Sequence, residues 1–134
     1  MLRKIYSFAA MAFVISTLLV SCGKTRHTEH IGEWSGVDYT GKAGGVVFER
    51  DGTGKIIEGD TSISCRYEID YSKRPIWLDL ILTRNGKEVR LKSIIEFIED
   101  NNKMRWRTYF DDTRPTAFLE KDPQHTIVLS RVSK

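Results

Sequence analysis

The residue types that carry most protein chemistry are sparse in this chain of 134 residues, which has three histidines and two cysteines. His27, Glu29 and His30 stand close together and offer two imidazoles and a carboxylate, a partial set of zinc ligands. The segment that carries them is polar and has no hydrophobic period, so it provides no scaffold to fix the geometry of a metal site. We therefore predict no metal ligand and no cofactor.

Catalytic groups are equally hard to bring together. His125 is the one histidine outside that segment, and it has no histidine partner and no recognisable nucleophile turn. Acidic pairs such as Asp111 and Asp112 fall in turn-like segments, where turn preference accounts for them. Cys65 alternates with apolar neighbours and is expected to be a buried, inert thiol. We predict no catalytic residue and a protein that is not an enzyme.

The N-terminus has the organisation of an export signal. Arg3 and Lys4 precede an uncharged, largely apolar run over 5–21. The run leads into Leu19-Val20-Ser21-Cys22-Gly23, which resembles the lipobox of bacterial lipoproteins. That resemblance implies cleavage before Cys22, a diacylglycerol on its thiol, and an acyl chain such as palmitate on the new amine. The alternative is an uncleaved transmembrane anchor, for which seventeen uncharged residues are at the short limit.

These assignments divide the chain into a signal peptide over 1–21, a lipidated cysteine with a flexible tether over 22–30, and a folded domain over 31–134. The mature chain would hold 134 − 21 = 113 residues, with Cys65 as its lone free thiol. Acylation predicts a lipoprotein anchored on the bacterial cell envelope. No Asp follows Cys22, which favours the outer membrane under the sorting rule of enteric bacteria.

Composition excludes several other classes. Lys and Arg number 21 against 18 Asp and Glu, and loss of the signal leaves 19 against 18. A near-neutral chain with interspersed charges lacks the concentrated basic face that nucleic acids require, so we predict no nucleic-acid partner. With 40% hydrophobic and 29% charged residues, the chain is neither disordered by composition nor polytopic in a membrane.

After residue 31, apolar and polar residues alternate with the period of two that indicates β-strands. We predict eight short strands, over 33–40, 45–50, 55–58, 62–70, 76–83, 89–97, 103–110 and 126–132. Asn85-Gly86 between two of them is a strong hairpin signal, because both residues tolerate positive φ. One face of most strands is apolar. This favours an all-β, antiparallel up-and-down barrel, with a two-sheet sandwich as the alternative.

Several short motifs resemble lipocalin-like barrels. Gly32, Trp34 and Arg131 match a G-x-W in the first strand and a terminal Arg that packs across the Trp ring. Three motifs are similar to small bacterial lipocalin-like, calycin-type lipoprotein domains of unknown function that are abundant in planctomycetes: the run from Tyr67 to Leu80, the later Arg114-Pro115-Thr116-Ala117-Phe118, and a final Leu129-x-Arg131. The resemblance implies a meander barrel and an exported protein, but no known chemistry.

Two surfaces of such a barrel are candidate binding sites. The inward side chains could line a ligand cavity or fill it; they are Tyr67, Leu80, Leu91, Phe97, Met104, Trp106 and Phe110. The outward basic side chains could contact anionic headgroups or an acidic protein; they are Arg90, Lys92, Lys103, Arg105 and Arg107. Our leading hypothesis is non-catalytic binding of a small apolar ligand inside the barrel. The alternative is a filled barrel that interacts with a protein or membrane through its basic face, which neighbouring glutamates could instead neutralise.

Overall fold

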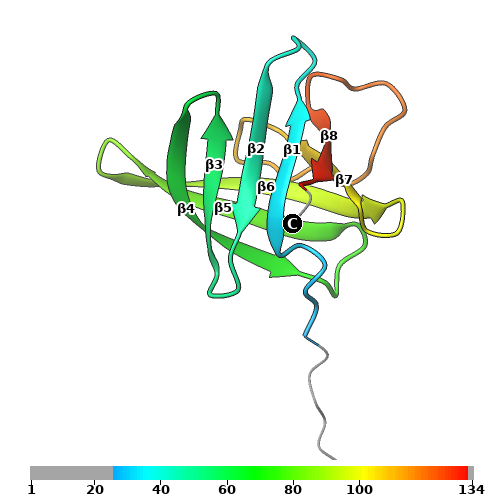
Figure 1. The fold of residues 1–134 in the computed structure, drawn as a ribbon, viewed down its shortest axis with the longest axis horizontal. Coiled ribbons are helices and arrows are strands. Elements are labelled where there is room, and N and C mark those ends of the chain that lie inside the picture. The colour runs from blue at the N-terminus through cyan, green and yellow to red at the C-terminus, as the bar shows by residue number, and fades with distance from the viewer. Residues whose placement is uncertain (1–25, 133–134) are drawn as a thin grey trace, which may run out of the picture.

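The computed structural model describes residues 26–132, which form an all-β structure without helices (Figure 1). Its strands are β1 Gly32–Val37, β2 Ala43–Phe48, β3 Thr53–Glu58, β4 Thr61–Asp70, β5 Ile76–Arg84, β6 Lys87–Ile98, β7 Lys103–Thr108 and β8 Thr126–Arg131. Each strand pairs antiparallel with the next, and β8 pairs with β1 to close the sheet. The prediction of an eight-stranded up-and-down barrel is confirmed, and a two-sheet sandwich is excluded.

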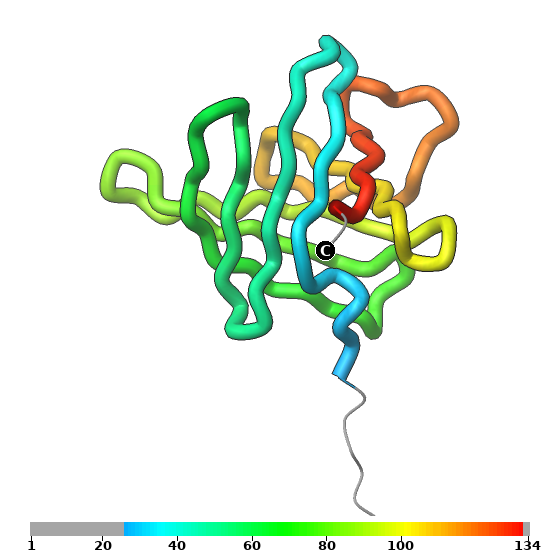
Figure 2. Tube along the Cα trace, viewed as in Figure 1, coloured from blue at the N-terminus to red at the C-terminus, as the bar shows by residue number. Residues whose placement is uncertain are grey.

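The turns follow from local chemistry. Asn85 and Gly86 have φ of 53° and 73°, and they join β5 to β6 with Arg84 paired to Lys87, as predicted from the Asn-Gly pair. This hairpin projects beyond the rest of the barrel (Figure 2). Four other turns share an Asp-x-Ser/Thr pattern, in which the carboxylate accepts from the backbone N–H and the hydroxyl two residues later. They begin at Asp38, Asp51, Asp70 and Asp111, and these bonds hold the pKa of each carboxyl below its usual value.

The core lies inside the barrel, where the inward side chains of neighbouring strands meet. The ring of Phe48 is stacked on Trp106 with centroids 6.0 Å apart and meets Tyr67 edge-on at 4.9 Å. Cys65 is buried as predicted, and burial raises the pKa of its thiol. Buried core members are Trp34, Val46, Phe48, Cys65, Tyr67, Leu78, Leu80, Leu82, Ile95, Met104, Trp106 and Leu129. The interior is therefore packed with side chains from all eight strands except β3, whose Ile56 packs against them from its partly buried position.

One end of the barrel is sealed around Trp34, which is wholly buried. The Arg131 guanidinium lies 4.2 Å from the Trp34 ring centroid, as the sequence motif predicted. Arg131 also donates to the carbonyls of Ile31, Glu29 and Asn101, so it ties the N-terminal segment and the β6–β7 turn to β8. All strand pairing and the core cluster lie within 32–131.

The predicted signal peptide and Cys22 lie outside the described residues. Within residues 26–132, the structure has no helix long and apolar enough to cross a bilayer.

Candidate functional site

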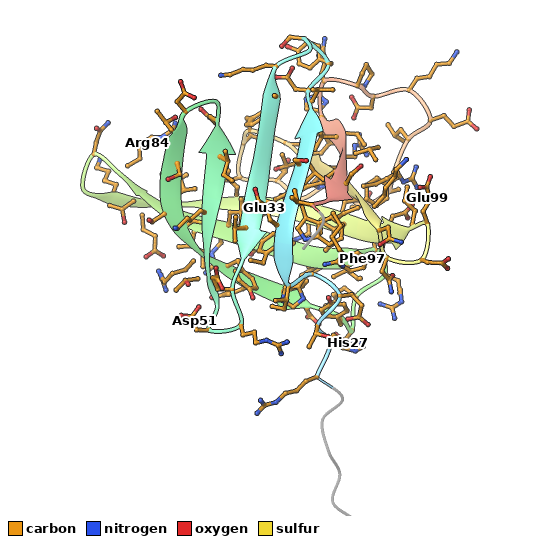
Figure 3. All side chains as sticks on the ribbon, in the orientation of Figure 1. His27, Glu33, Asp51, Arg84, Phe97 and Glu99 are labelled. Atoms are coloured by element: carbon orange, nitrogen blue, oxygen red, sulfur yellow. The ribbon has the colours of Figure 1, made fainter. Side chains whose placement is uncertain are left out.

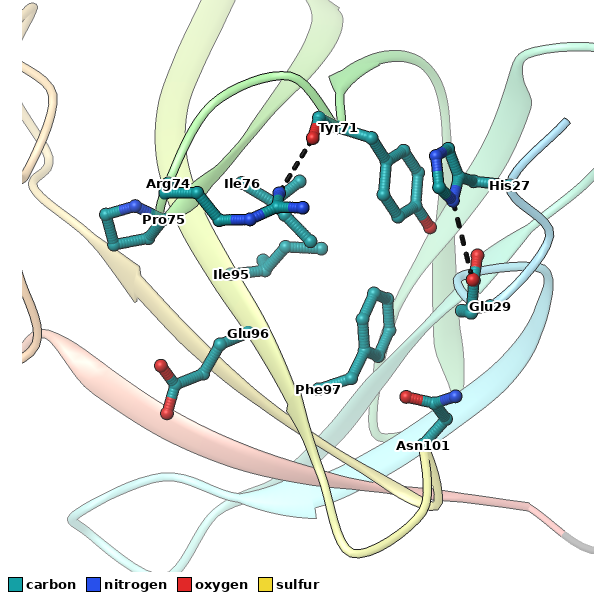
Figure 4. A pocket seen from close by; sticks show the side chains of 10 residues that line it. All are labelled: His27, Glu29, Tyr71, Arg74, Pro75, Ile76, Ile95, Glu96, Phe97 and Asn101. Carbon is teal, nitrogen blue, oxygen red and sulfur yellow. Dashed lines mark hydrogen bonds and ion pairs between the residues drawn. The ribbon is translucent and has the colours of Figure 1, made fainter. Parts of the chain in front are cut away.

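The candidate site is a pocket of about 450 Å³ at the end of the barrel where the chain enters β1. We name this the N-terminal end. The residues before β1 and the β2–β3, β4–β5 and β6–β7 turns lie there, because each strand of an antiparallel meander reverses direction. The pocket opens between the N-terminal segment, the β4–β5 loop and the end of β6 (Figure 4).

The floor and one wall of the pocket are apolar or aromatic. Ile76 at the start of β5 and Ile95 and Phe97 near the end of β6 face the pocket, and Ile95 is wholly buried. The rings of Phe97 and Tyr71 are nearly parallel, with centroids 6.4 Å apart. His27 stacks on Tyr71 at 4.1 Å. An apolar group can therefore be covered by aliphatic and aromatic carbon together.

The charged groups of the pocket differ in whether they have a partner. Glu96 forms an ion pair with Arg105, and the Glu29 carboxylate lies 3.5 Å from His27 Nδ1. Arg74 Nη1 donates to the carbonyl oxygens of Tyr71 and Lys73, at 2.7 and 3.0 Å. Arg74 makes no ion pair with a carboxylate within residues 26–132.

A buried histidine lies beneath this wall. His30 is 5% exposed, with Nδ1 2.8 Å from the Tyr71 hydroxyl and Nε2 3.1 Å from the Tyr67 hydroxyl. Tyr67 donates its hydroxyl hydrogen to the Glu49 carbonyl, so the network assigns the His30 proton to Nε2 and makes Nδ1 the acceptor from Tyr71. Burial lowers the pKa of His30 to about 4. Burial, with the nearby Glu29 carboxylate, also raises the pKa of Tyr71. The imidazole is therefore neutral at pH 7.

The prediction of a flexible tether over 22–30 is wrong for the part that the structure describes. The Ile31 N–H bonds to the Thr28 carbonyl at 3.0 Å, His27 stacks on Tyr71, and His30 is buried. These residues are held by contacts with a loop more than forty positions away in the sequence. The local pattern, which has no hydrophobic period, therefore gives no sign that they are packed. His30 is engaged by the hydroxyls of Tyr67 and Tyr71, and within residues 26–132 no group of three potential metal ligands is placed to hold an ion.

The predicted inward residues divide into three groups. Tyr67, Leu80, Met104 and Trp106 are buried in the core, and Leu91 packs against it from a partly buried position. Phe97 alone among them lines the pocket. The prediction for Phe110 is wrong, because this side chain is 79% exposed. The alternating pattern continues to residue 110, but β7 ends at Thr108 and the chain leaves the sheet there.

The predicted outward basic residues do not form a free basic patch. Arg107 is 4% exposed, because the β7–β8 loop covers it and supplies Asp122, the Ala117 carbonyl and the Tyr109 hydroxyl as acceptors. Arg105 pairs with Glu96 and lies 4.6 Å from the Phe118 ring centroid.

The other three members of that set are also engaged. Arg90 bridges Glu68 and Asp79, Lys103 pairs with Glu99, and Lys92 donates to the Asp112 carbonyl. Asp79 is largely buried; desolvation opposes its charge, but Arg114 and Arg90 hold its pKa below the usual value. Glu68 and Asp79 therefore act as ion-pair partners of arginines and not as a pair of free carboxylates.

The chain matches no protein-family model, no curated protein and no solved structure. The closed barrel and the Trp34–Arg131 contact are features that the resemblance to lipocalin-like domains implied. A barrel of this kind does not identify that family, so membership stays a prediction.

Proposed function

We propose that this protein is a lipoprotein of the bacterial cell envelope, lipocalin-like in family, that binds a small, mostly apolar ligand without catalysing a reaction. The pocket at the N-terminal end supports this proposal most directly, because it combines an apolar floor with a few polar groups, as small-molecule sites do. The packed interior leads us to place the ligand at the end of the barrel and not inside it. The paired charges of the outer face give no support to an interaction module that acts through a basic patch.

Ligand binding can be tested with the soluble chain that begins at Gly23. We expect wild type to bind the uncharged apolar dye N-phenyl-1-naphthylamine, and Phe97→Ala to bind it about tenfold more weakly, since it loses part of the apolar wall. Phe110→Ala removes the same ring from an exposed position and is expected to bind like wild type. Fluorescence titration gives the affinities, with unfolding measured for each variant. Absence of dye binding by wild type, or equal loss in both variants, would contradict the proposal.

The proposed anchor has a separate test. Labelled palmitate fed to expressing bacteria is expected to enter the full chain and its Cys65→Ser variant, because Cys65 is a buried core thiol. The Cys22→Ser variant is expected to take up no label and to leave the membrane fraction, since the acyl chains that hold it there are missing. Label in Cys22→Ser, or none in wild type, would contradict lipidation at Cys22.

A further inference from the structure

We infer that the pocket at the N-terminal end selects an amphiphile with an anionic head, a carboxylate or phosphate ester, and that Arg74 binds this head. The inference rests on the proposed function and specifies its ligand class.

The first support is the state of the Arg74 guanidinium. Its Nη1 is held by the carbonyls of Tyr71 and Lys73, which fixes the group against the β4–β5 loop. Its Nε and Nη2 have no hydrogen-bond partner within residues 26–132, and Figure 4 shows the guanidinium extending from Pro75 toward the middle of the pocket. A guanidinium with remaining donors in a fixed fork suits the oxygens of a carboxylate or phosphate.

The second support is that the carboxylates of the pocket do not neutralise Arg74. Glu96 is paired with Arg105 on the outer face of β6 and β7. Glu29 lies beside His27, on the opposite wall of the pocket from Arg74 (Figure 4). An anion near Arg74 therefore meets a positive charge that the fold leaves uncompensated, although the guanidinium is exposed and partly screened by solvent.

The third support is the position of the apolar floor relative to this charge. In Figure 4, Ile76 lies next to the Arg74 guanidinium on the side of the Tyr71 ring, Ile95 lies beyond Ile76, and Phe97 continues the apolar surface toward Asn101. A ligand whose head lies on Arg74 can therefore place an alkyl chain on these side chains. The volume of about 450 Å³ is within the range of small-molecule sites, roughly 300–1,000 Å³.

The proposed anchor favours a lipid-derived amphiphile over a free anion. His27 in the pocket wall is five positions after Cys22, and an extended chain spans at most about 3.5 Å per position. The pocket would then lie within about 18 Å of the lipidated cysteine. Tethering at this distance gives the pocket a high effective concentration of membrane amphiphiles.

Competition against the bound dye tests the ligand class in the soluble chain that begins at Gly23. The competitors are dodecyl phosphate, dodecanol and inorganic phosphate, each below the concentration at which the alkyl compounds aggregate. We expect wild type to bind dodecyl phosphate about tenfold more tightly than dodecanol, and inorganic phosphate not to displace the dye at millimolar concentration.

The variants then separate charge from general damage. Arg74→Gln is expected to bind both alkyl compounds with the affinity that wild type shows for dodecanol, and Arg74→Lys to keep part of the preference. Arg84→Gln removes an exposed arginine on the opposite side of the barrel from His27 and should change nothing (Figure 3).

Each contrary result has its own meaning. Equal affinity of wild type for the two alkyl compounds, or a preference that survives Arg74→Gln, overturns the anionic head while apolar binding stands. Displacement by inorganic phosphate as effective as by dodecyl phosphate overturns the amphiphile in favour of a free anion. Failure of the dye and of both alkyl compounds to bind wild type overturns the proposed function itself.

Discussion

Replacing Arg107 by Met is expected to lower the free energy of unfolding by about 3 kcal/mol, near the lower end of the range for breaking a buried ion pair. The guanidinium is 4% exposed and donates to Asp122 Oδ2 from Nε and Nη2, at 2.9 and 2.6 Å. It also bonds the Ala117 carbonyl and the Tyr109 hydroxyl. Met keeps much of the apolar stem but leaves all three acceptors without their donor. The stability is therefore lost because buried polar acceptors have no hydrogen-bond donor, and the loop that covers them keeps water from replacing it.

Arg105→Met is the matched control, because Arg105 lies two residues earlier on the same face of β7. Its side chain is 36% exposed and pairs with an equally exposed Glu96, so its replacement should cost less than about 1 kcal/mol. Urea unfolding followed by circular dichroism measures both variants. Cleavage by a nonspecific protease within 109–125 should increase only in Arg107→Met, since Arg107 ties this loop to the barrel. Equal destabilisation by the two substitutions would show that burial of Arg107 does not matter.

The strands could be predicted from the sequence because period-two alternation and turn chemistry are local signals. All eight predicted strands occur, and the Asn85-Gly86 hairpin forms as expected. The end of β7 could not be predicted, because a strand ends where its partners end. Thr108 is the last residue of β7 paired with β6, and Arg107 the last paired with β8. Phe110 therefore lies in the loop although its alternation pattern continues.

The candidate site was less accessible to sequence reasoning, since it depends on loops that meet in space. Alternation assigned Phe97 correctly to the inner face, but nothing local brings Tyr71 and Arg74 to the segment around His27. The polar composition of that segment instead predicts a tether. The available signal was a histidine just before the first strand and two tyrosines near the end of β4. The meander topology places these residues at the same end of the barrel, so the signal can be recognised only once that topology is assumed.

The outer face shows the same division between local and tertiary information. Alternation correctly directed Arg105 and Arg107 away from the core. It could not show that residues 109–125 fold back over Arg107, or that each arginine meets a carboxylate on another segment. A run of outward basic residues therefore predicts which face of the barrel they occupy. The net charge of that face depends on the acidic partners that the fold brings to it, which the run itself does not predict.

Acidification is expected to destabilise the protein in an interval that His30 determines. The pKa of His30 is about 4 in the folded state, against an ordinary value of 6.5 when unfolded. Between these values the unfolded chain binds a proton that the folded chain does not, so stability is full above pH 6.5 and falls as the pH falls to 4. At about 1.4 kcal/mol per pH unit, the loss is roughly 3 kcal/mol. Burial opposes the charge most; Glu29 favours it and His27 opposes it.

A glutamine variant isolates this contribution. His30→Gln keeps a neutral polar side chain among the hydroxyls of Tyr67 and Tyr71, and it should unfold with little pH dependence between 6.5 and 4, even if its stability at pH 7 is lower. Carboxylates with lowered pKa, such as Asp51 and Asp70, lose their stabilising effect mainly below pH 4, so they do not mask the interval. A wild-type slope in His30→Gln would mean that groups other than His30 cause the pH dependence. In that case His30 accepts its proton within the Tyr67–Tyr71 network at no cost to the fold, and a neutral imidazole is not what holds the segment that forms the pocket wall.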